Sequence, residues 1–397
     1  MKRPEMNPPE PIHTPIHTPI TINVDRDTLD RQWMQRALEL ARQGAGKVEP
    51  NPMVGCVVIR QGQIIGKGYH RCFGGPHAEV DALQPLLAAN VPLNDATVYV
   101  TLEPCSHTGK TPPCADALIT AGVQRVVIAH LDPNPQVNGA GVARLRQAGI
   151  AVDVGCLQTQ AAEVLAPFLK VVTQRLPWVI AKWAMSVDGK IATTSGNSQW
   201  ISNPRSRQVV QQLRGRVDAI VVGSRTAYVD DPLLTARPEF EQDVLRRATR
   251  IVVDSQAGLS LESQLVRTAE QFPTLIAVGP SASPEKLDSL KQAGCEIWQG
   301  RSTEHLCRLS ELLTYLASQG MTNLLVEGGG GLLGGLNDLG QIDEAHVFIA
   351  PKILGGATAV TPLAGIGVSS VADGAPFRIL NSEVLAGDLY LTARRNR

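Results

Sequence analysis

The sequence has no excess of charge of either sign. Its 37 lysines and arginines balance 37 aspartates and glutamates, and the two signs are interspersed along the chain. A nucleic-acid interface is marked by clustered basic residues with interleaved aromatics, and only 4% of the residues are aromatic here. A segment that lies on a membrane surface also needs a basic patch. We therefore expect neither a nucleic-acid partner nor a membrane partner.

Long apolar runs and regularly spaced cysteines are also missing. No segment approaches the roughly 18 consecutive apolar residues of a transmembrane helix, and prolines interrupt any signal-peptide core near the N-terminus. The seven cysteines are an odd number without regular spacing, which argues against a disulfide framework and for a reducing compartment. We expect a cytoplasmic protein whose 397 residues form two or three domains.

The chain divides into a short tail and two α/β segments. Residues 1–26 are rich in proline and contain the repeat PIHTPIHTPI, so we expect a disordered tail that cannot build a core. Residues 27–175 alternate strand-like and helix-like patterns, which predicts a layered α/β domain. The alternation starts again over residues 176–397, where late segments such as DLYLTARRN are predicted to be antiparallel strands. This second part is expected to be a doubly wound sheet that binds ligands beyond the carboxyl ends of its strands.

Three residues of the first domain are suited to bind a metal ion. His77, Cys105 and Cys114 offer one imidazole and two thiols, which Zn²⁺ prefers, and three protein ligands leave a fourth position for water. Glu79 would move protons between that water and a leaving nitrogen, as in the H-x-E…P-C-x-x-C signature of nucleobase deaminases. We expect His77 and Glu79 in the first turn of a helix, and short helices after both cysteines that favour their thiolates. Eight residues separate the cysteines instead of two, which indicates an insertion in the metal loop.

Other interpretations of these residues account for less of the sequence. A His-x-Glu pair alone is usually the start of a surface helix, and two cysteines alone are usually small buried hydrophobic residues. A structural zinc module would close the fourth position with another cysteine or histidine. A further alternative is a zinc deaminase that acts on tRNA or another nucleic acid, fused to an unrelated nucleotide-binding domain. The balanced charge argues against that alternative.

A glycine-rich segment marks a second site in the C-terminal part of the chain. The string NLLVEGGGGLLGGL places a glycine run between a strand and a helix start, where backbone N–H groups can approach a pyrophosphate. It lacks the G-x-G-x-x-G spacing, so alone it is equally compatible with a flexible turn. Other polar and aromatic residues accompany it, namely Asp230, Glu327, Arg214, Arg237 and Trp200. Because arginine binds phosphate in a fork, this set predicts a nucleotide cofactor together with a phosphorylated substrate.

Ordered motifs along nearly the whole chain after Asp27 resemble one family, the bifunctional riboflavin-biosynthesis deaminase/reductase (RibD/RibG) family. Its deaminase half is similar to this chain at PNPMVGCVV, GYHRCFGGPHAEV, VTLEPCSHTGKTPPCADAL and DPNPQVNGAG. Its reductase half is similar at KWAMSVDGKIA, SGNSQWIS, VGSRTAYVDDPLLTAR, VEGGGGLL and APKILGG. The resemblance implies a cytidine-deaminase-like α/β/α domain followed by a dihydrofolate-reductase-like doubly wound domain.

The resemblance also implies two reactions. The first domain would deaminate 2,5-diamino-6-ribosylamino-4(3H)-pyrimidinone 5′-phosphate with the help of Zn²⁺. The second would use NADPH to reduce the ribosyl group of 5-amino-6-(5-phosphoribosylamino)uracil to ribityl. The implied partners are small-molecule pyrimidine ribotides, and we expect a homo-oligomer.

Roles of individual residues follow from the same resemblance. In the deaminase half it implies that His77, Cys105 and Cys114 are zinc ligands and that Glu79 is a proton shuttle. It implies contacts to the substrate at Asn51, His70, His107 and Lys110. In the reductase half it implies NADPH contacts at Ala184, Trp200, Thr226, Asp230, Gly329, Gly330, Gly331, Leu332, Leu333, Gly334 and Gly335. It implies contacts to the ribose and phosphate of the substrate at Lys182, Ser198, Arg214, Leu234, Arg237 and Glu327.

Overall fold

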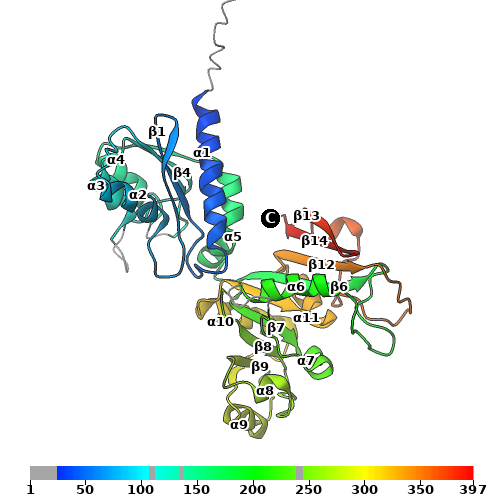
Figure 1. Cartoon of the computed structure of the whole chain (residues 1–397). Coiled ribbons are helices and arrows are strands. Elements are labelled where there is room, and N and C mark those ends of the chain that lie inside the picture. Colours follow the sequence, from blue (N-terminus) through cyan, green and yellow to red (C-terminus); the bar gives the residue numbers. More distant parts are fainter. Residues whose placement is uncertain (1–24, 107–111, 135–136, 238–244, 397) are drawn as a thin grey trace, which may run out of the picture.

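The computed structural model describes residues 25–106, 112–134, 137–237 and 245–396. The predicted N-terminal tail, apart from its last two residues, lies outside these ranges, and so do His107 and Lys110. The described residues form two α/β units, and Figure 1 shows them joined at the end of helix α5. In this part of the chain, no helix has both the length and the apolar character needed to span a bilayer.

The first unit is built on a five-stranded sheet with the order β2-β1-β3-β4-β5. β2 and β3 pair antiparallel with β1, whereas β3, β4 and β5 run parallel. The strands are β1 (Gly55–Arg60), β2 (Gln63–Tyr69), β3 (Thr97–Leu102), β4 (Arg125–His130) and β5 (Ala151–Val154). Between β1 and β2, Gln61 and Gly62 both have positive φ, as a two-residue turn between twisted strands requires.

Helices cover both faces of this sheet because its strands are apolar on both sides. Successive residues such as Val57 and Val58 point to opposite faces, and both are buried. One face packs against α2 (Ala78–Ala88), α3 (Cys114–Ala121) and α4 (Ala140–Gln147). The other packs against α1 (Arg26–Ala41), which the short turn η1 (Arg42–Gly44) extends, and against α5 (Gln158–Gln174). The predicted α/β/α layering of the first domain is thus confirmed.

The second unit is built on a nine-stranded sheet with the order β10-β9-β8-β7-β11-β6-β12-β14-β13. The strands from β10 to β12 are parallel, and β14 pairs antiparallel with both β12 and β13. The strands are β6 (Trp178–Ser186), β7 (Ala219–Gly223), β8 (Thr249–Val253), β9 (Thr274–Val278), β10 (Glu296–Gln299), β11 (Asn323–Glu327), β12 (Glu344–Ala350), β13 (Phe377–Leu385) and β14 (Asp388–Arg395). The doubly wound sheet with late antiparallel strands agrees with the sequence prediction.

Two helical layers enclose this second sheet. One layer contains α6 (Pro204–Arg214), α7 (Ser224–Asp230), α8 (Gln264–Arg267) and α9 (Pro284–Gln292). The other contains α10 (His305–Ser318) and α11 (Gly330–Asp338), and the short turn η3 (Val371–Asp373) precedes β13. Local sequence sets the helix starts: Asn203 caps α6 with Pro204 at its first turn, and the Glu304 carboxylate accepts two N–H groups at the start of α10.

A buried ion pair connects helix α5 of the first unit to the sheet of the second. The Lys170 Nζ lies 2.6 Å from a carboxylate oxygen of Asp343, and both side chains are almost completely buried. The same oxygen of Asp343 accepts the backbone N–H of Val179, at the start of β6, at 2.7 Å. Because a buried carboxylate is costly without its cation, this pair fixes how α5 leads into the second sheet.

Replacing Lys170 with methionine tests that role. Lys170→Met keeps the apolar stem but leaves the buried Asp343 carboxylate without its cation, so we expect the free energy of unfolding to fall by about 3–5 kcal/mol. Urea unfolding followed by tryptophan fluorescence measures the change. The matched control is Lys291→Met, which breaks an exposed pair with Asp288, and there we expect a change below about 1 kcal/mol. An equally small change in Lys170→Met would show that the buried pair does not hold the two units together.

Candidate functional site

The predicted metal ligands come together at the ends of three elements. His77 is the N-cap residue of α2, Cys114 is the first residue of α3, and Cys105 lies three residues beyond the end of β3. The His77 Nδ1 lies 3.2 Å from the Cys114 Sγ and 3.6 Å from the Cys105 Sγ. All three ligand atoms lie within 4.8 Å of one another. Within the described ranges, no other set of three histidine, cysteine or carboxylate side chains is grouped in this way. One nitrogen and two sulfur donors at this spacing fit Zn²⁺ and leave a coordination position open.

The surroundings of Cys105 favour its thiolate. A hydrogen bond from the Cys114 thiol is the largest of several effects that together lower the pKa of Cys105 to about 4; burial opposes the shift, and His77 contributes to it. The backbone N–H of Cys114 also donates to the Cys105 Sγ at 3.3 Å. The expected helix at the second cysteine is present, since α3 begins at Cys114 itself. The expected helix after Cys105 falls on residues 107–111, which lie outside the described ranges.

Glu79 lies beside the three ligands without being one of them. It occupies the first turn of α2, as predicted, and is only 3% exposed. Burial raises the pKa of Glu79 to about 7. A carboxyl group with a pKa near neutrality takes up and releases a proton readily, which is the property that a general acid/base needs.

Two of the four predicted substrate residues of the first unit lie next to the metal ligands. The Asn51 Nδ2 lies 3.2 Å from the His70 Nε2, and the other ring nitrogen of His70 lies 2.9 Å from the carbonyl oxygen of Pro76. The rings of His70 and His77 meet edge to face with centroids 5.5 Å apart. Asn51 and His70 therefore form one wall of the metal centre, whereas His107 and Lys110 are outside the described residues.

Glu103 is a residue of this region that the sequence analysis missed. Its carboxylate accepts the backbone N–H groups of Asp132 at 3.2 Å, Gly139 at 3.0 Å and Val142 at 3.1 Å. It thereby holds the segment that follows β4 against the end of β3, two residues before Cys105. The signal was present in the sequence as an acidic residue directly before Pro104.

In the second unit, a carboxylate and two cations gather at the carboxyl ends of the strands. Glu327 ends β11 and lies opposite Lys182 of β6 in the strand register. The Arg214 guanidinium holds both oxygens of Glu327, with Nε at 2.6 Å and a terminal nitrogen at 3.0 Å, and the Lys182 Nζ lies at 3.8 Å. Burial alone would raise the pKa of Glu327, but the charges of Arg214 and Lys182 outweigh it and lower that pKa. Burial lowers the pKa of Lys182.

The pairing with Glu327 occupies much of the Arg214 guanidinium. Its remaining terminal nitrogen donates to the carbonyl oxygen of Thr235 at 3.3 Å, so all three guanidinium nitrogens face protein acceptors. Arg237 is exposed, and its backbone N–H is held by the Gln211 side chain at 2.8 Å. Leu234 is buried, with φ of 49°. Three of the five N–H donors of Arg214 are thus directed at Glu327 and Thr235, and the Arg237 residue is exposed.

Two further predicted residues, Ser198 and Asp230, contact each other. The Ser198 Oγ lies 3.3 Å from an oxygen of Asp230, the last residue of α7, and burial raises the pKa of Asp230 while Ser198 and Lys182 oppose that rise. A cavity of about 90 Å³ includes Ser198 and Trp200 in its lining. Trp200 is 63% exposed and carries the Arg207 guanidinium 4.5 Å from its ring centre.

The glycine run lies between β11 and α11, as predicted, and its residues differ in burial. A side-chain carbon at Gly329 would meet the Thr226 hydroxyl at 3.3 Å, and Gly331 is exposed. The side chains of Leu332 and Leu333 pack in the core, so a cofactor contact there would use backbone N–H groups of the first helical turn. Gly330 and Gly334, two further predicted cofactor contacts, are buried against residues 361–364. Gly335, also predicted, lies against Leu309. Ala184 lies half-buried on β6.

Two family models match the chain, one for each unit. Residues 27–130 match the cytidine and deoxycytidylate deaminase zinc-binding region, and residues 177–391 match the RibD C-terminal domain. The riboflavin biosynthesis protein RibD of Escherichia coli is 40% identical over 372 residues, which cover 91% of this chain and 98% of that protein. RibD of Actinobacillus pleuropneumoniae is 39% identical over 363 residues, which cover 91% of this chain and 94% of that protein.

Solved structures agree over the same length. Acinetobacter baumannii RibD superposes with a TM-score of 0.81 at 34% identity, covering 94% of this chain and all of that one. A diaminohydroxyphosphoribosylaminopyrimidine deaminase/5-amino-6-(5-phosphoribosylamino)uracil reductase from Thermotoga maritima superposes with a TM-score of 0.79 at 32% identity, with the same coverage. Because one set of relatives spans both units, the alternative of a nucleic-acid deaminase fused to an unrelated domain is not supported.

Substitution of one ligand tests the metal centre. Purified wild-type protein is expected to carry about one zinc ion per chain, and Cys105→Ser is expected to lose it, because a catalytic site has only three protein ligands. Metal analysis of the two proteins by mass spectrometry measures the difference. Cys307→Ser, at an exposed cysteine of α10, is the control and should keep its zinc. Zinc retained at the wild-type level in Cys105→Ser would remove that residue from the ligand set.

Proposed function

Because this chain belongs to the RibD family of bifunctional riboflavin-biosynthesis enzymes, we propose that its two units act in succession on one pyrimidine ribotide. Residues 27–175 form the deaminase and residues 176–397 the reductase, which agrees with the segments that the two family models match. The observation that carries the proposal is the metal centre, where Glu79 is buried but left out of the ligand set. A carboxylate in that position serves hydrolysis and not the closure of a structural zinc site.

The first reaction replaces the amino group on the pyrimidine ring of 2,5-diamino-6-ribosylamino-4(3H)-pyrimidinone 5′-phosphate with oxygen and releases ammonia. Zn²⁺ held by His77, Cys105 and Cys114 would supply an activated water. Glu79 takes a proton from that water and delivers it to the departing nitrogen. Asn51 and His70 hold the ring at the centre.

The inserted metal loop provides the phosphate anchor of the first reaction. His107 and Lys110 belong to the eight residues between Cys105 and Cys114, and both offer donors that can carry positive charge. A free nucleotide, unlike a base within a polynucleotide, must be held by its own 5′-phosphate. We therefore assign these two residues to the substrate phosphate.

The second reaction converts the ribosyl group of 5-amino-6-(5-phosphoribosylamino)uracil to ribityl. The glycine run together with Ala184, Trp200, Thr226 and Asp230 would hold NADPH, which would supply the hydride. Lys182 and Arg214 keep Glu327 ionised, and an ionised carboxylate accepts hydrogen bonds from the ribose hydroxyls. Ser198 and Leu234 complete the ribose side, and Arg237 binds the phosphate. Residues of these two sets would bring the substrate and the cofactor together for hydride transfer.

We also propose where the enzyme acts and how it assembles. The described helices include none that spans a bilayer, and the substrates are small molecules. Within this proposal the enzyme acts in the cytoplasm as a homo-oligomer, and size-exclusion chromatography with light scattering measures that state.

Glu79→Gln separates proton transfer from metal binding. Glutamine has nearly the same shape but cannot exchange a proton, so we expect deamination to fall on the order of 10²-fold or more while zinc is retained. Ammonia release and zinc content measure the two effects. Reduction of supplied 5-amino-6-(5-phosphoribosylamino)uracil by the same variant is the internal control and should be unchanged. Deamination within a few-fold of the wild type would reduce Glu79 to a carboxylate at a helix start.

Arg237→Ala tests the phosphate contact in the reductase. Losing a charged hydrogen bond is expected to weaken substrate binding by about 1.5–3 kcal/mol, seen as a raised KM, with NADPH affinity nearly unchanged. Steady-state reduction kinetics and fluorescence titration with NADPH measure the two affinities. Arg267→Ala, which removes another exposed arginine, should change neither. Weaker NADPH binding with an unchanged substrate KM would show that Arg237 faces the cofactor.

A further inference from the structure

A loop of the deaminase unit rests directly on the reductase unit. Residues 45–54 connect η1 to β1, and Gly46 lies in this loop with φ of 77°. A side-chain carbon at Gly46 would stand 2.6 Å from the Cβ of Arg216, which belongs to the reductase unit. Only glycine permits that approach, because both the backbone conformation and the contact exclude a side chain.

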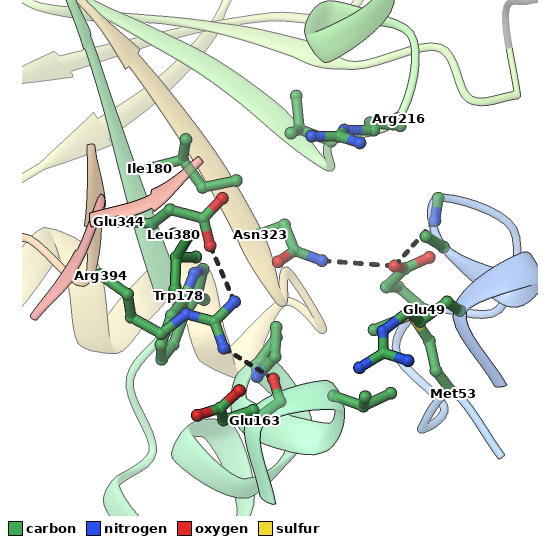
Figure 2. Close-up of a pocket in the computed structure, with 16 residues that line it drawn as sticks. Glu49, Met53, Glu163, Trp178, Ile180, Arg216, Asn323, Glu344, Leu380 and Arg394 are labelled. Carbon is green, nitrogen blue, oxygen red and sulfur yellow. Dashed lines mark hydrogen bonds and ion pairs between the residues drawn. The ribbon is translucent and has the colours of Figure 1, made fainter. Parts of the chain in front are cut away.

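Glu49 is the centre of this contact. It is 5% exposed, and its carboxylate accepts the backbone N–H groups of Gly46 and Val48, each at 3.1 Å. The same carboxylate accepts the side-chain amide of Asn323 from the reductase unit at 3.4 Å, and Figure 2 shows the two groups joined by a dashed line. Both residues line a cavity of about 330 Å³. Glu49 thus folds its own loop and attaches that loop to the neighbouring unit.

Arg246 supplies a second attachment from the reductase unit. One terminal nitrogen donates to the Glu49 carbonyl oxygen at 2.7 Å, and the other donates to the Asp218 carboxylate. The second oxygen of Asp218 accepts the backbone N–H groups of Thr322 and Asn323, each at 2.8 Å. Arg246 therefore connects the loop backbone to the amino end of β11, the strand that also presents Asn323.

This loop also carries a substrate residue of the deaminase. The Asn51 N–H donates to the Val48 carbonyl oxygen at 2.9 Å, and its side chain reaches His70 beside the metal ligands. Only one residue separates Asn51 from Glu49, so a shift of Glu49 moves Asn51 directly. A displacement on the order of 1 Å at a substrate contact is enough to weaken a reaction substantially.

The reductase chemistry lies at the opposite end of the same strands. Asn323 begins β11 and Glu327 ends it, so about 13 Å of strand separates the loop contact from the reductase carboxylate. A change at the loop contact is thus expected to leave the reductase site intact. The reductase activity of the same molecule can serve as its own control.

We propose that Arg246 and Asn323 are positioning residues of the deaminase: the reductase unit holds Glu49 so that Asn51 meets the pyrimidine substrate. This inference rests on the proposed substrate role of Asn51. It makes the reductase unit a structural part of the deaminase site, although it contributes no group to the reaction.

The first test is Arg246→Ala in the full-length protein. We expect the deaminase KM to rise about tenfold with kcat within about twofold, since the substrate contact is displaced and the metal centre is not. Zinc content and reductase kinetics should match the wild type. Arg247→Ala removes the neighbouring, exposed arginine and should leave both reactions unchanged. A parallel loss of deaminase and reductase activity in Arg246→Ala would overturn the proposal, because it would indicate general destabilisation.

A double variant tests whether the effect passes through Asn51. Asn51→Ala alone should raise the deaminase KM, and adding Arg246→Ala should change it by less than about twofold more, because coupled residues are not additive. Effects that multiply would overturn the positioning role and leave the substrate role of Asn51 standing. An unchanged KM in Asn51→Ala would instead overturn the substrate role itself, and with it this inference.

Discussion

Parallel pairing of strands is the constraint on which both sites depend. Parallel strands bring all their carboxyl ends to one edge of a sheet, and the loops there meet whatever lies beyond that edge. In the first sheet this places Cys105 just after β3, where the starts of α2 and α3 bring His77 and Cys114. In the second it places Glu327 at the end of β11, next to Lys182 of the adjacent strand. In the second sheet, the amino ends of the strands remain for contacts with the first unit, as at Asn323.

Several contacts between the two units are polar and buried. Lys170 pairs with Asp343 across 173 positions of sequence, and Arg246 reaches the Glu49 carbonyl oxygen across 197. Buried charged and hydrogen-bonded groups tolerate little displacement, because a partner left alone in the interior is costly. The two sites are therefore held in one fixed relation by groups that take no part in either reaction.

The sequence predicted the metal centre because the information for it is local. Imidazole and thiol donors, a nearby carboxylate and flanking helix patterns stand within about forty residues, and the fold has only to bring three ends together. Residues that interact across a long stretch of sequence are not marked by a local pattern of this kind. The pairing of Arg214 with Glu327 joins residues 113 positions apart, and the role of Glu49 depends on Asn323, 274 positions away. Strand β13 was also missed, because nearly all its residues are exposed and no apolar face alternates along it.

In this enzyme, one chain carries out a hydrolytic and a reductive step on the same pyrimidine ribotide. The most direct measurement supplies the purified protein with 2,5-diamino-6-ribosylamino-4(3H)-pyrimidinone 5′-phosphate and follows ammonia and NADPH in separate assays. We predict that ammonia is released with or without NADPH, and that NADPH, when present, is then oxidised in a one-to-one ratio with it. NADPH oxidation without ammonia release, or ammonia release that never leads to NADPH oxidation, would show that the two steps do not follow each other on this chain.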